Sequence, residues 1–124
     1  MADLENSKFI PDDSGQSSKF DLIICDAPCT GSGTWSRTPE QLIHFKKESI
    51  LPYQELQKRI VTHVMPRLQN DGLFFYITCS VFKKENEEVV HHILQNTNLQ
   101  LVKQEYFKGY TEKADTLFAA LFSL

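Results

Sequence analysis

Two short segments of the sequence place a cysteine among polar and turn-forming residues. Asp26-Ala27-Pro28-Cys29 ends one apolar run and leads into Gly31-Ser32-Gly33, and Thr78-Cys79-Ser80 ends a later apolar run. Thiols near helix starts and beside polar groups are the reactive kind, because such surroundings favour the thiolate. Cys29 and Cys79 are therefore candidate reactive thiols, with inert structural cysteines as the alternative.

The third cysteine, Cys25, lies inside an apolar run, where a free cysteine is usually a small core residue. The spacing of the three cysteines and of the His91-His92 pair fits no standard zinc pattern, so we expect no metal. The cysteine count is odd, and we find neither a signal peptide nor an apolar run long enough to span a bilayer. These features predict reduced thiols in a cytoplasmic protein.

The overall composition predicts one globular domain with a modest core. The chain has 124 residues, of which 41% are hydrophobic, with five glycines and five prolines. Its net charge of −3 gives no general attraction to nucleic acid, so an RNA partner must be held by local contacts. Residues 1–19 are polar and are expected to form a lead-in to the domain of residues 20–124.

The glycines of Gly31-Ser32-Gly33 could cradle a phosphate, but the rest of a nucleotide-binding loop is missing. The dinucleotide fingerprint needs a third glycine where Ser36 stands, and the Gly-Lys-Ser/Thr of a P-loop is absent. We therefore interpret the segment as a tight turn with close backbone approach. Arg37, just after this turn, is the candidate phosphate contact.

A strand, helices and a second strand connect the two cysteine segments. Residues 20–25 form a short apolar run typical of a buried strand. A short helix begins at Thr38-Pro39 and ends near Lys47, and an amphipathic helix runs from Pro52 to a turn at residues 70–72. Residues 73–79 then form a strand covered on both faces.

This order of elements predicts a crossover between two parallel, neighbouring strands. Ligands collect outside the carboxyl ends of such strands. One strand ends at residues 26–29 and the other at residues 78–80. We therefore expect both thiols and the Asp26 carboxylate to converge on one rim, whereas an antiparallel pairing would separate them.

The rest of the chain predicts one more helix and two more strands. Paired apolar residues at 89–90 and 93–94 indicate an amphipathic helix over residues 84–95. Residues 99–107 and 116–124 are strand-like and could pair antiparallel at the edge of the sheet. The fold class predicted from these elements is α/β.

The segments DAPCTGSGTWSRTPEQ (26–41) and DGLFFYITCSVFKKENEEVV (71–90) resemble motifs IV and VI of the Sun-type RNA cytosine-5 methyltransferases. The closing DTLFAALFSL (115–124) is similar to the last strand of that family, which usually has a glycine at the position of Thr116. The resemblance covers roughly residues 20–124. It implies a partial Rossmann-like fold that depends on S-adenosylmethionine, with parallel strands, a C-terminal antiparallel hairpin and helices packed on the sheet.

The resemblance also implies a role for each site residue. Cys79 would add to C6 of cytosine and so activate C5 for methylation, and Cys29 would assist release of the covalent RNA adduct. Asp26 would stabilise the protonated adduct at the N3 edge of the cytosine and would also border the methyl donor. Pro28 would border the donor as well, and it would shape the turn. The candidate contacts to the substrate, an rRNA or a tRNA, are Arg37, Thr78 and Ser80.

One departure from the family concerns the donor-binding part of the domain. In the family a glycine-rich loop and acidic residues precede the Asp-Ala-Pro-Cys motif, and residues 1–25 resemble neither. We therefore expect the chain to be the C-terminal half of a catalytic domain, inactive by itself. The strand at residues 20–25 would then lack a partner on one side, and this open edge predicts self-association.

Two other functions remain open from the sequence. A non-catalytic scaffold or RNA-contacting module could carry the same motifs by descent. An amino-group methyltransferase is disfavoured, because its strand-end motif needs an aromatic residue that stacks on the base, and Cys29 stands after Ala27-Pro28 here.

Overall fold

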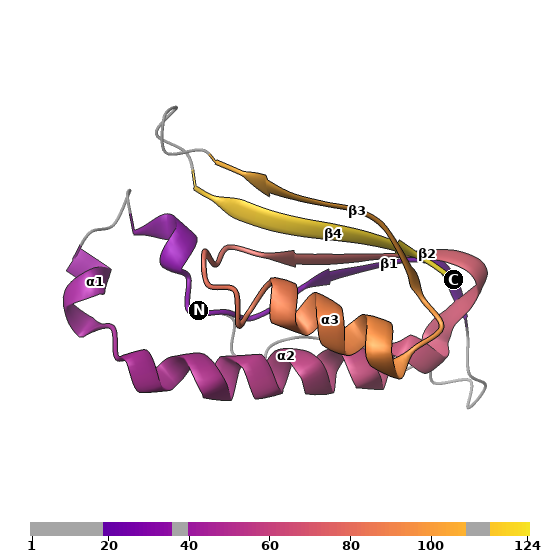
Figure 1. Cartoon of the computed structure of the whole chain (residues 1–124), viewed down its shortest axis with the longest axis horizontal. Coiled ribbons are helices and arrows are strands. Elements are labelled where there is room, and N and C mark those ends of the chain that lie inside the picture. The colour runs from indigo at the N-terminus through magenta and orange to yellow at the C-terminus, as the bar shows by residue number, and fades with distance from the viewer. Residues whose placement is uncertain (1–18, 36–39, 109–114) are drawn as a thin grey trace.

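The computed structural model describes residues 19–35, 40–108 and 115–124. Four strands form one sheet in the order β1-β2-β4-β3, and the longer helices lie along one side of it (Figure 1). The strands are β1 (Phe20–Asp26), β2 (Leu68–Thr78), β3 (Gln100–Phe107) and β4 (Leu117–Ser123). The helices are α1 (Glu40–His44), α2 (Ile50–Val64) and α3 (Glu87–Asn96), with 3-10 turns η1 (Ser32–Thr34), η2 (Lys47–Ser49) and η3 (Met65–Arg67).

The predicted crossover is confirmed. β1 pairs parallel with β2, with Ile24 opposite Phe75 and Asp26 opposite Ile77, and α2 connects the two strands. Both strands therefore end at the same edge of the sheet, near α1 (Figure 1). The predicted antiparallel hairpin is also confirmed, because β3 pairs antiparallel with β4, and β4 pairs antiparallel with β2.

The predicted end of the long helix is wrong. α2 ends at Val64, and β2 begins at Leu68 rather than after Gly72. Pro66 lies in η3, and a proline cannot continue an α-helix because it lacks the backbone N–H. The turn-like residues Asp71 (φ 64°) and Gly72 instead lie inside β2, where the pairing with β1 shifts register. They act as an irregularity within the strand.

Two other helix boundaries differ from the prediction. α1 ends at His44 rather than near Lys47, and its expected start at Thr38-Pro39 lies outside the described residues. α3 begins at Glu87 rather than at residue 84, because the preceding residues form a turn. The predicted lead-in at residues 1–19 lies, apart from its last residue, outside the described part of the chain.

The core fills the space between the sheet and the two longer helices. Alternate side chains of β2 and β4, including Phe74, Tyr76, Phe118 and Phe122, point toward α2 and α3 and are almost completely buried. On the helix side they meet aliphatic residues, among them Val61, Val89, Val90 and Ile93. This two-layer packing holds the carboxyl ends of β1 and β2 in fixed positions.

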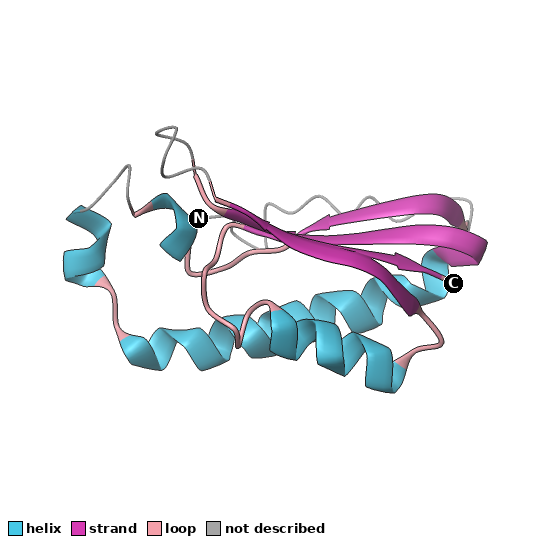
Figure 2. Ribbon diagram, turned by 45° about the horizontal axis from the view of Figure 1, so that its top comes forward, coloured by secondary structure: helices cyan, strands magenta, loops and turns pink. Residues whose placement is uncertain are grey.

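The opposite face of the sheet carries exposed apolar side chains. Leu22 and Ile24 of β1 are 49% and 61% exposed, and Leu73 and Leu117 on the neighbouring strands are 40% exposed. Figure 2 shows α2 and α3 together on the other side of the strands. In the described ranges, β1 is hydrogen-bonded to β2 and to no second strand. None of the helices described is long and apolar enough to cross a membrane.

The open edge of β1 predicts self-association. We expect light scattering coupled to size exclusion to give an average mass that rises with concentration, because unpaired strand edges and apolar faces recruit other chains. The substitution Ile24→Lys should shift the mass toward the monomer. Val102→Lys, at an equally exposed position on the opposite edge strand β3, tests whether association uses that edge instead, and we expect a smaller shift. A constant monomer mass for the unmodified chain at high concentration would contradict this prediction.

Candidate active site

The two candidate reactive thiols are in contact. Cys29 lies in the loop after β1 and Cys79 directly follows β2, and their Sγ atoms are 3.2 Å apart. Cys29 is 8% exposed and Cys79 is partly exposed. The expected convergence of the two thiols at one rim is therefore confirmed, whereas their chemical roles remain predictions.

The contact between the thiols separates their acidities. The hydrogen bond from the Cys29 thiol lowers the pKa of Cys79 to about 7, although partial burial and the negative charge of Asp26 oppose this shift. The same bond, together with burial, raises the pKa of Cys29. Cys79 is therefore the thiol that ionises near neutral pH, and Cys29 stays protonated beside it.

Cys25 differs from the other two cysteines, as the sequence predicts. It lies in the hydrophobic core, and burial raises its pKa to about 12. A neutral, buried thiol is a poor nucleophile. Cys25 therefore has a packing role.

A buried carboxylate joins the two thiol-bearing loops. Glu85 has no exposed surface, and its side chain accepts hydrogen bonds from the backbone N–H and the hydroxyl of Thr30, each at 2.8 Å. It also accepts a bond from the Ser80 hydroxyl and one of 3.3 Å from Gln57 Nε2. Since Thr30 follows Cys29 and Ser80 follows Cys79, this single side chain fixes both loops.

Neighbouring polar groups reinforce this connection. The Asn86 amide donates to the backbone carbonyl of Ser80 at 2.8 Å, and its oxygen accepts a 2.5 Å bond from the Thr78 hydroxyl. The Tyr76 hydroxyl donates to the Glu85 carbonyl at 2.6 Å. Gln57 Nε2 donates to the carbonyl of Pro28 at 2.9 Å, so that α2 also holds the first loop.

Gly33 connects the first loop to the sheet through its backbone. Its N–H donates to the Cys79 carbonyl at 2.7 Å, and its carbonyl accepts from the Thr116 N–H at 2.9 Å. A Cβ atom at this position would lie 2.2 Å from the Thr116 oxygen and 2.7 Å from the Cys79 oxygen. Close backbone approach therefore requires glycine here, in agreement with the sequence interpretation.

The structure places the other predicted site residues differently. Asp26 is exposed at the carboxyl end of β1, whereas Pro28 is buried in the loop. Thr78 and Ser80 have no exposed surface, and their hydroxyls bond to Asn86 and Glu85. Their expected contact with RNA does not fit this burial, and we assign them to holding the loops instead. Arg37 lies outside the described residues.

Sequence reasoning missed Glu85, Asn86 and Gln57. Glu85 and Asn86 stand in the charged run Lys83-Lys84-Glu85-Asn86-Glu87-Glu88, which is typical of a solvated surface. Gln57 occupies a helix position at which a polar residue is ordinarily exposed. The only signal for Glu85 and Asn86 is their short distance in sequence from Cys79, and it does not separate Glu85 from Glu87 or Glu88. Gln57 has no such signal.

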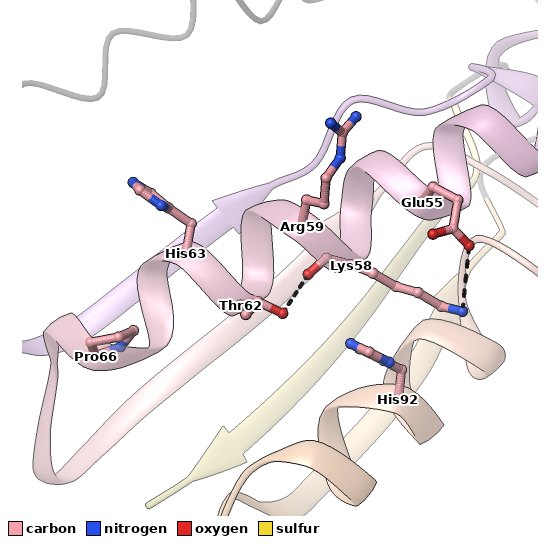
Figure 3. Close-up of a pocket in the computed structure, with 7 residues that line it drawn as sticks. All are labelled: Glu55, Lys58, Arg59, Thr62, His63, Pro66 and His92. Atoms are coloured by element: carbon pink, nitrogen blue, oxygen red, sulfur yellow. Dashed lines mark hydrogen bonds and ion pairs between the residues drawn. The ribbon is translucent and has the colours of Figure 1, made fainter.

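A larger concavity of about 660 Å³ lies elsewhere, on the outer side of α2 and α3 (Figure 3). Lys58 pairs with Glu55 at 4.0 Å, and burial together with the charge of Lys58 lowers the pKa of His92. This surface contains neither thiol. Among the residues that the structure describes, no group of three His, Cys, Asp or Glu side chains is arranged to hold a metal ion.

The parallel β1-α2-β2 unit with its ligand rim at the strand ends is the architecture of Rossmann-like methyltransferases. Solved methyltransferase structures share this fold. The family described as 16S rRNA methyltransferase RsmB/F matches residues 2–120, and the chain belongs to that family.

Curated relatives agree with this assignment. Ribosomal RNA small subunit methyltransferase B of Xylella fastidiosa is 35% identical over 78 residues, which cover 63% of this chain and 18% of the relative. Ribosomal RNA small subunit methyltransferase F of Vibrio parahaemolyticus is 31% identical over 97 residues, covering 78% of this chain and 20% of the relative. The chain therefore spans about a fifth of the length of these relatives.

Two solved structures are similar in fold. A methyltransferase homolog protein from Pyrococcus horikoshii has a TM-score of 0.72 and 26% identity, covering 86% of this chain and 39% of that one. NSun6 from Pyrococcus horikoshii, solved with SFG, has a TM-score of 0.76 and 21% identity, covering 87% of this chain and 31% of that one. The fold of the chain is thus a part of a larger methyltransferase fold.

The thiol contact predicts the reactivity of Cys79. We expect the rate of alkylation of Cys79 by iodoacetamide to follow an ionisation near pH 7, because the Cys29 thiol stabilises the thiolate. Removing that donor with Cys29→Ala should move the ionisation up toward the ordinary thiol value of about 8.5. Peptide mapping by mass spectrometry distinguishes the cysteines, and Cys25 should stay unmodified in the folded chain. An unchanged pH profile in Cys29→Ala would contradict the assignment.

The buried carboxylate predicts a loss of stability on neutralisation. Glu85→Gln replaces one acceptor oxygen with an NH₂ group that cannot accept from Thr30 or Ser80, so we expect unfolding free energy to fall by about 1.5–3 kcal/mol. The matched control is Glu88→Gln, which changes an exposed acid three residues away and should alter stability by less than about 0.5 kcal/mol. Urea unfolding measures both values. Equal, small effects would show that Glu85 does not hold the loops.

Proposed function

We propose that this chain carries the nucleophile of an S-adenosylmethionine-dependent RNA methyltransferase that modifies C5 of cytosine in rRNA or tRNA. The observation that supports it is the contact of 3.2 Å between the sulfurs of Cys29 and Cys79. One of these thiols is acidic and partly exposed, and the other is buried and protonated. Membership of an rRNA methyltransferase family supports the same reaction class.

The proposed reaction uses two thiols in different states. C5 of cytosine is a poor nucleophile, so the Cys79 thiolate first adds to C6 and pushes its electron pair toward C5. C5 then takes the methyl group. A water molecule next takes the C5 proton, the electrons of the C5–H bond restore the C5–C6 double bond, and the C6–S bond breaks so that Cys79 leaves as a thiolate. Cys29, in contact with Cys79, is placed to assist this release by donating its hydrogen bond to the departing thiolate.

Asp26 is proposed to act on the cytosine ring. Its charge raises the pKa of both Cys25 and Cys79, and it stands at the end of β1, three residues before Cys29. It is exposed at the strand end, where it can accept a hydrogen bond from a protonated N3 and stabilise the adduct.

The methyl donor, S-adenosylmethionine, supplies an electrophilic methyl group when bound. The exposed Asp26 fits a role at the border of this cofactor, as the family resemblance implies. Pro28 is buried and has its carbonyl bonded to Gln57, so it fits a role in shaping the loop rather than in direct contact. Because the chain spans about a fifth of the curated relatives, we propose that it does not turn over alone. Tight cofactor binding in a calorimetric titration of this chain would contradict that.

Methylation assays of the two cysteine variants test the proposal. In a chain extended upstream by a donor-binding region, Cys79→Ala should reduce methyl transfer to cytosine-containing RNA to background, because the adduct cannot form. Cys29→Ala should instead accumulate protein bound covalently to RNA, because release is impaired. Denaturing gels that retain the covalent complex, together with transfer of labelled methyl groups, measure both.

The control for this assay is the third cysteine. Cys25→Ala removes a core thiol, and this variant should still transfer methyl groups and should accumulate no covalent complex with RNA. A scaffold without catalysis would give no methyl transfer with the unmodified protein and no trapped complex with Cys29→Ala, and either result would overturn the proposal.

A further inference from the structure

A second cavity lies beside the thiol pair and is lined largely by aromatic and polar side chains. It measures about 400 Å³, within the roughly 300–1,000 Å³ of small-molecule sites. Its lining comes from the loop that contains η1, from α1, from the segment between α1 and α2 that includes η2, and from α2. Its lining residues are Thr30, Trp35, Gln41, Phe45, Lys46, Ser49 and Tyr53.

Two aromatic side chains of this cavity, Trp35 and Phe45, contact each other and the ring of Phe82. The rings of Trp35 and Phe45 have centroids 4.8 Å apart at an angle of 59°, and Phe82 stacks on Phe45 at 5.5 Å and 20°. Trp35 also meets Phe82 edge-on at 5.9 Å. All three rings are only partly buried, although rings of this size ordinarily fill a core. Trp35 and Phe45 therefore give the cavity an aromatic wall, and both rings pack against Phe82.

The cavity borders the proposed reaction centre. Thr30 lines it and directly follows Cys29, and both its N–H and its hydroxyl are bonded to Glu85. Burial raises the pKa of Tyr53, and the nearby charge of Glu85 raises it further. Tyr53 is therefore a neutral ring close to the thiol pair, on the wall of the same cavity.

Lys46 gives the cavity a positive charge at an exposed position. Aromatic surfaces next to a cation are the usual means of holding single-stranded RNA, with bases stacked on the rings and a phosphate near the ammonium group. The concavity of Figure 3 has cations but no Trp, Tyr or Phe among its lining residues, and its Lys58 is paired with Glu55. The aromatic cavity therefore matches a nucleotide better than the larger concavity does.

We propose that the cavity of Trp35, Phe45, Lys46 and Tyr53 binds a nucleotide of the substrate RNA that neighbours the target cytosine, with its base on the rings and its phosphate near Lys46. The proposal rests on the proposed function for the identity of the ligand as RNA. Stacking on rings tolerates any base, so this subsite contributes affinity and positioning with little sequence preference. It would hold the strand while the adjacent cytosine reaches Cys79.

Trp35 provides a direct measurement, because it is the only tryptophan of the chain. The probe is a short single-stranded RNA without cytosine, such as an oligomer of adenosine, added to the chain while Trp35 fluorescence is recorded. We expect a saturable change in emission. Phe45→Ala should weaken binding roughly tenfold, as expected for loss of a stacking surface. Lys46→Gln should weaken binding and lower the slope of log affinity against log salt by about one.

Lys58→Gln is the matched control, because it removes a lysine from the concavity of Figure 3 and should leave the titration unchanged. Lys46 is exposed, so Lys46→Gln tests the proposal even where Phe45→Ala disturbs folding, and circular dichroism checks both variants. No saturable change with the unmodified chain would overturn the proposal. A titration weakened by Lys58→Gln but not by Lys46→Gln would also overturn it and place the RNA on the outer side of α2.

The experiment also separates this subsite from the proposed chemistry. The titration uses an RNA without cytosine, so it reports binding at the aromatic cavity and not the proposed reaction at Cys79. Binding at Trp35 without methyl transfer in the extended chain would support the subsite and contradict the proposed reaction. Methyl transfer with an unchanged KM for RNA in both Phe45→Ala and Lys46→Gln would support the proposed reaction and contradict the subsite.

Discussion

The arrangement of the site depends on one buried carboxylate. A charged group without exposed surface is costly unless each of its oxygens is hydrogen-bonded, and Glu85 meets this condition with donors from Thr30, Gln57 and Ser80. These donors belong to the two thiol loops and to α2. Moving either loop away would leave the carboxylate unsatisfied, so the fold penalises any structure in which the two sulfurs separate.

The sheet brings the two thiol loops to the same rim, and the Glu85 carboxylate holds their sulfurs in contact. Parallel pairing of β1 and β2 makes both strands end at one rim, but strand ends alone leave their loops free to diverge. The backbone of Gly33 adds a second connection by bonding to Cys79 and Thr116 at once, which only a residue without Cβ permits. These connections hold the two sulfurs 3.2 Å apart, close enough for the Cys29 thiol to donate a hydrogen bond to Cys79. This bond lowers the pKa of Cys79.

The strand pairing and the thiol convergence could be predicted from the sequence, because apolar runs and the spacing of the cysteine motifs are local signals. The predicted end of α2 is wrong because Asn70-Asp71-Gly72 has the composition of a turn but lies in a strand irregularity, and Pro66 ends the helix earlier. Glu85 could not be predicted as a buried group, because its burial follows from loops brought together by the tertiary fold. Thr78 and Ser80 are predicted as RNA contacts because polar residues at a strand end are ordinarily exposed, and the sequence does not show that their hydroxyls bond to Asn86 and Glu85.

Mild oxidation followed by peptide mapping tests the central claim most directly, because a disulfide forms only between thiols that the fold holds together. The account predicts a peptide linked through Cys29 and Cys79 in the native chain, with Cys25 left reduced. It also predicts a lower yield of this link in Glu85→Gln and an unchanged yield in Glu88→Gln. Linkage of Cys25 as often as of the other two cysteines, or a yield that does not depend on Glu85, would contradict it.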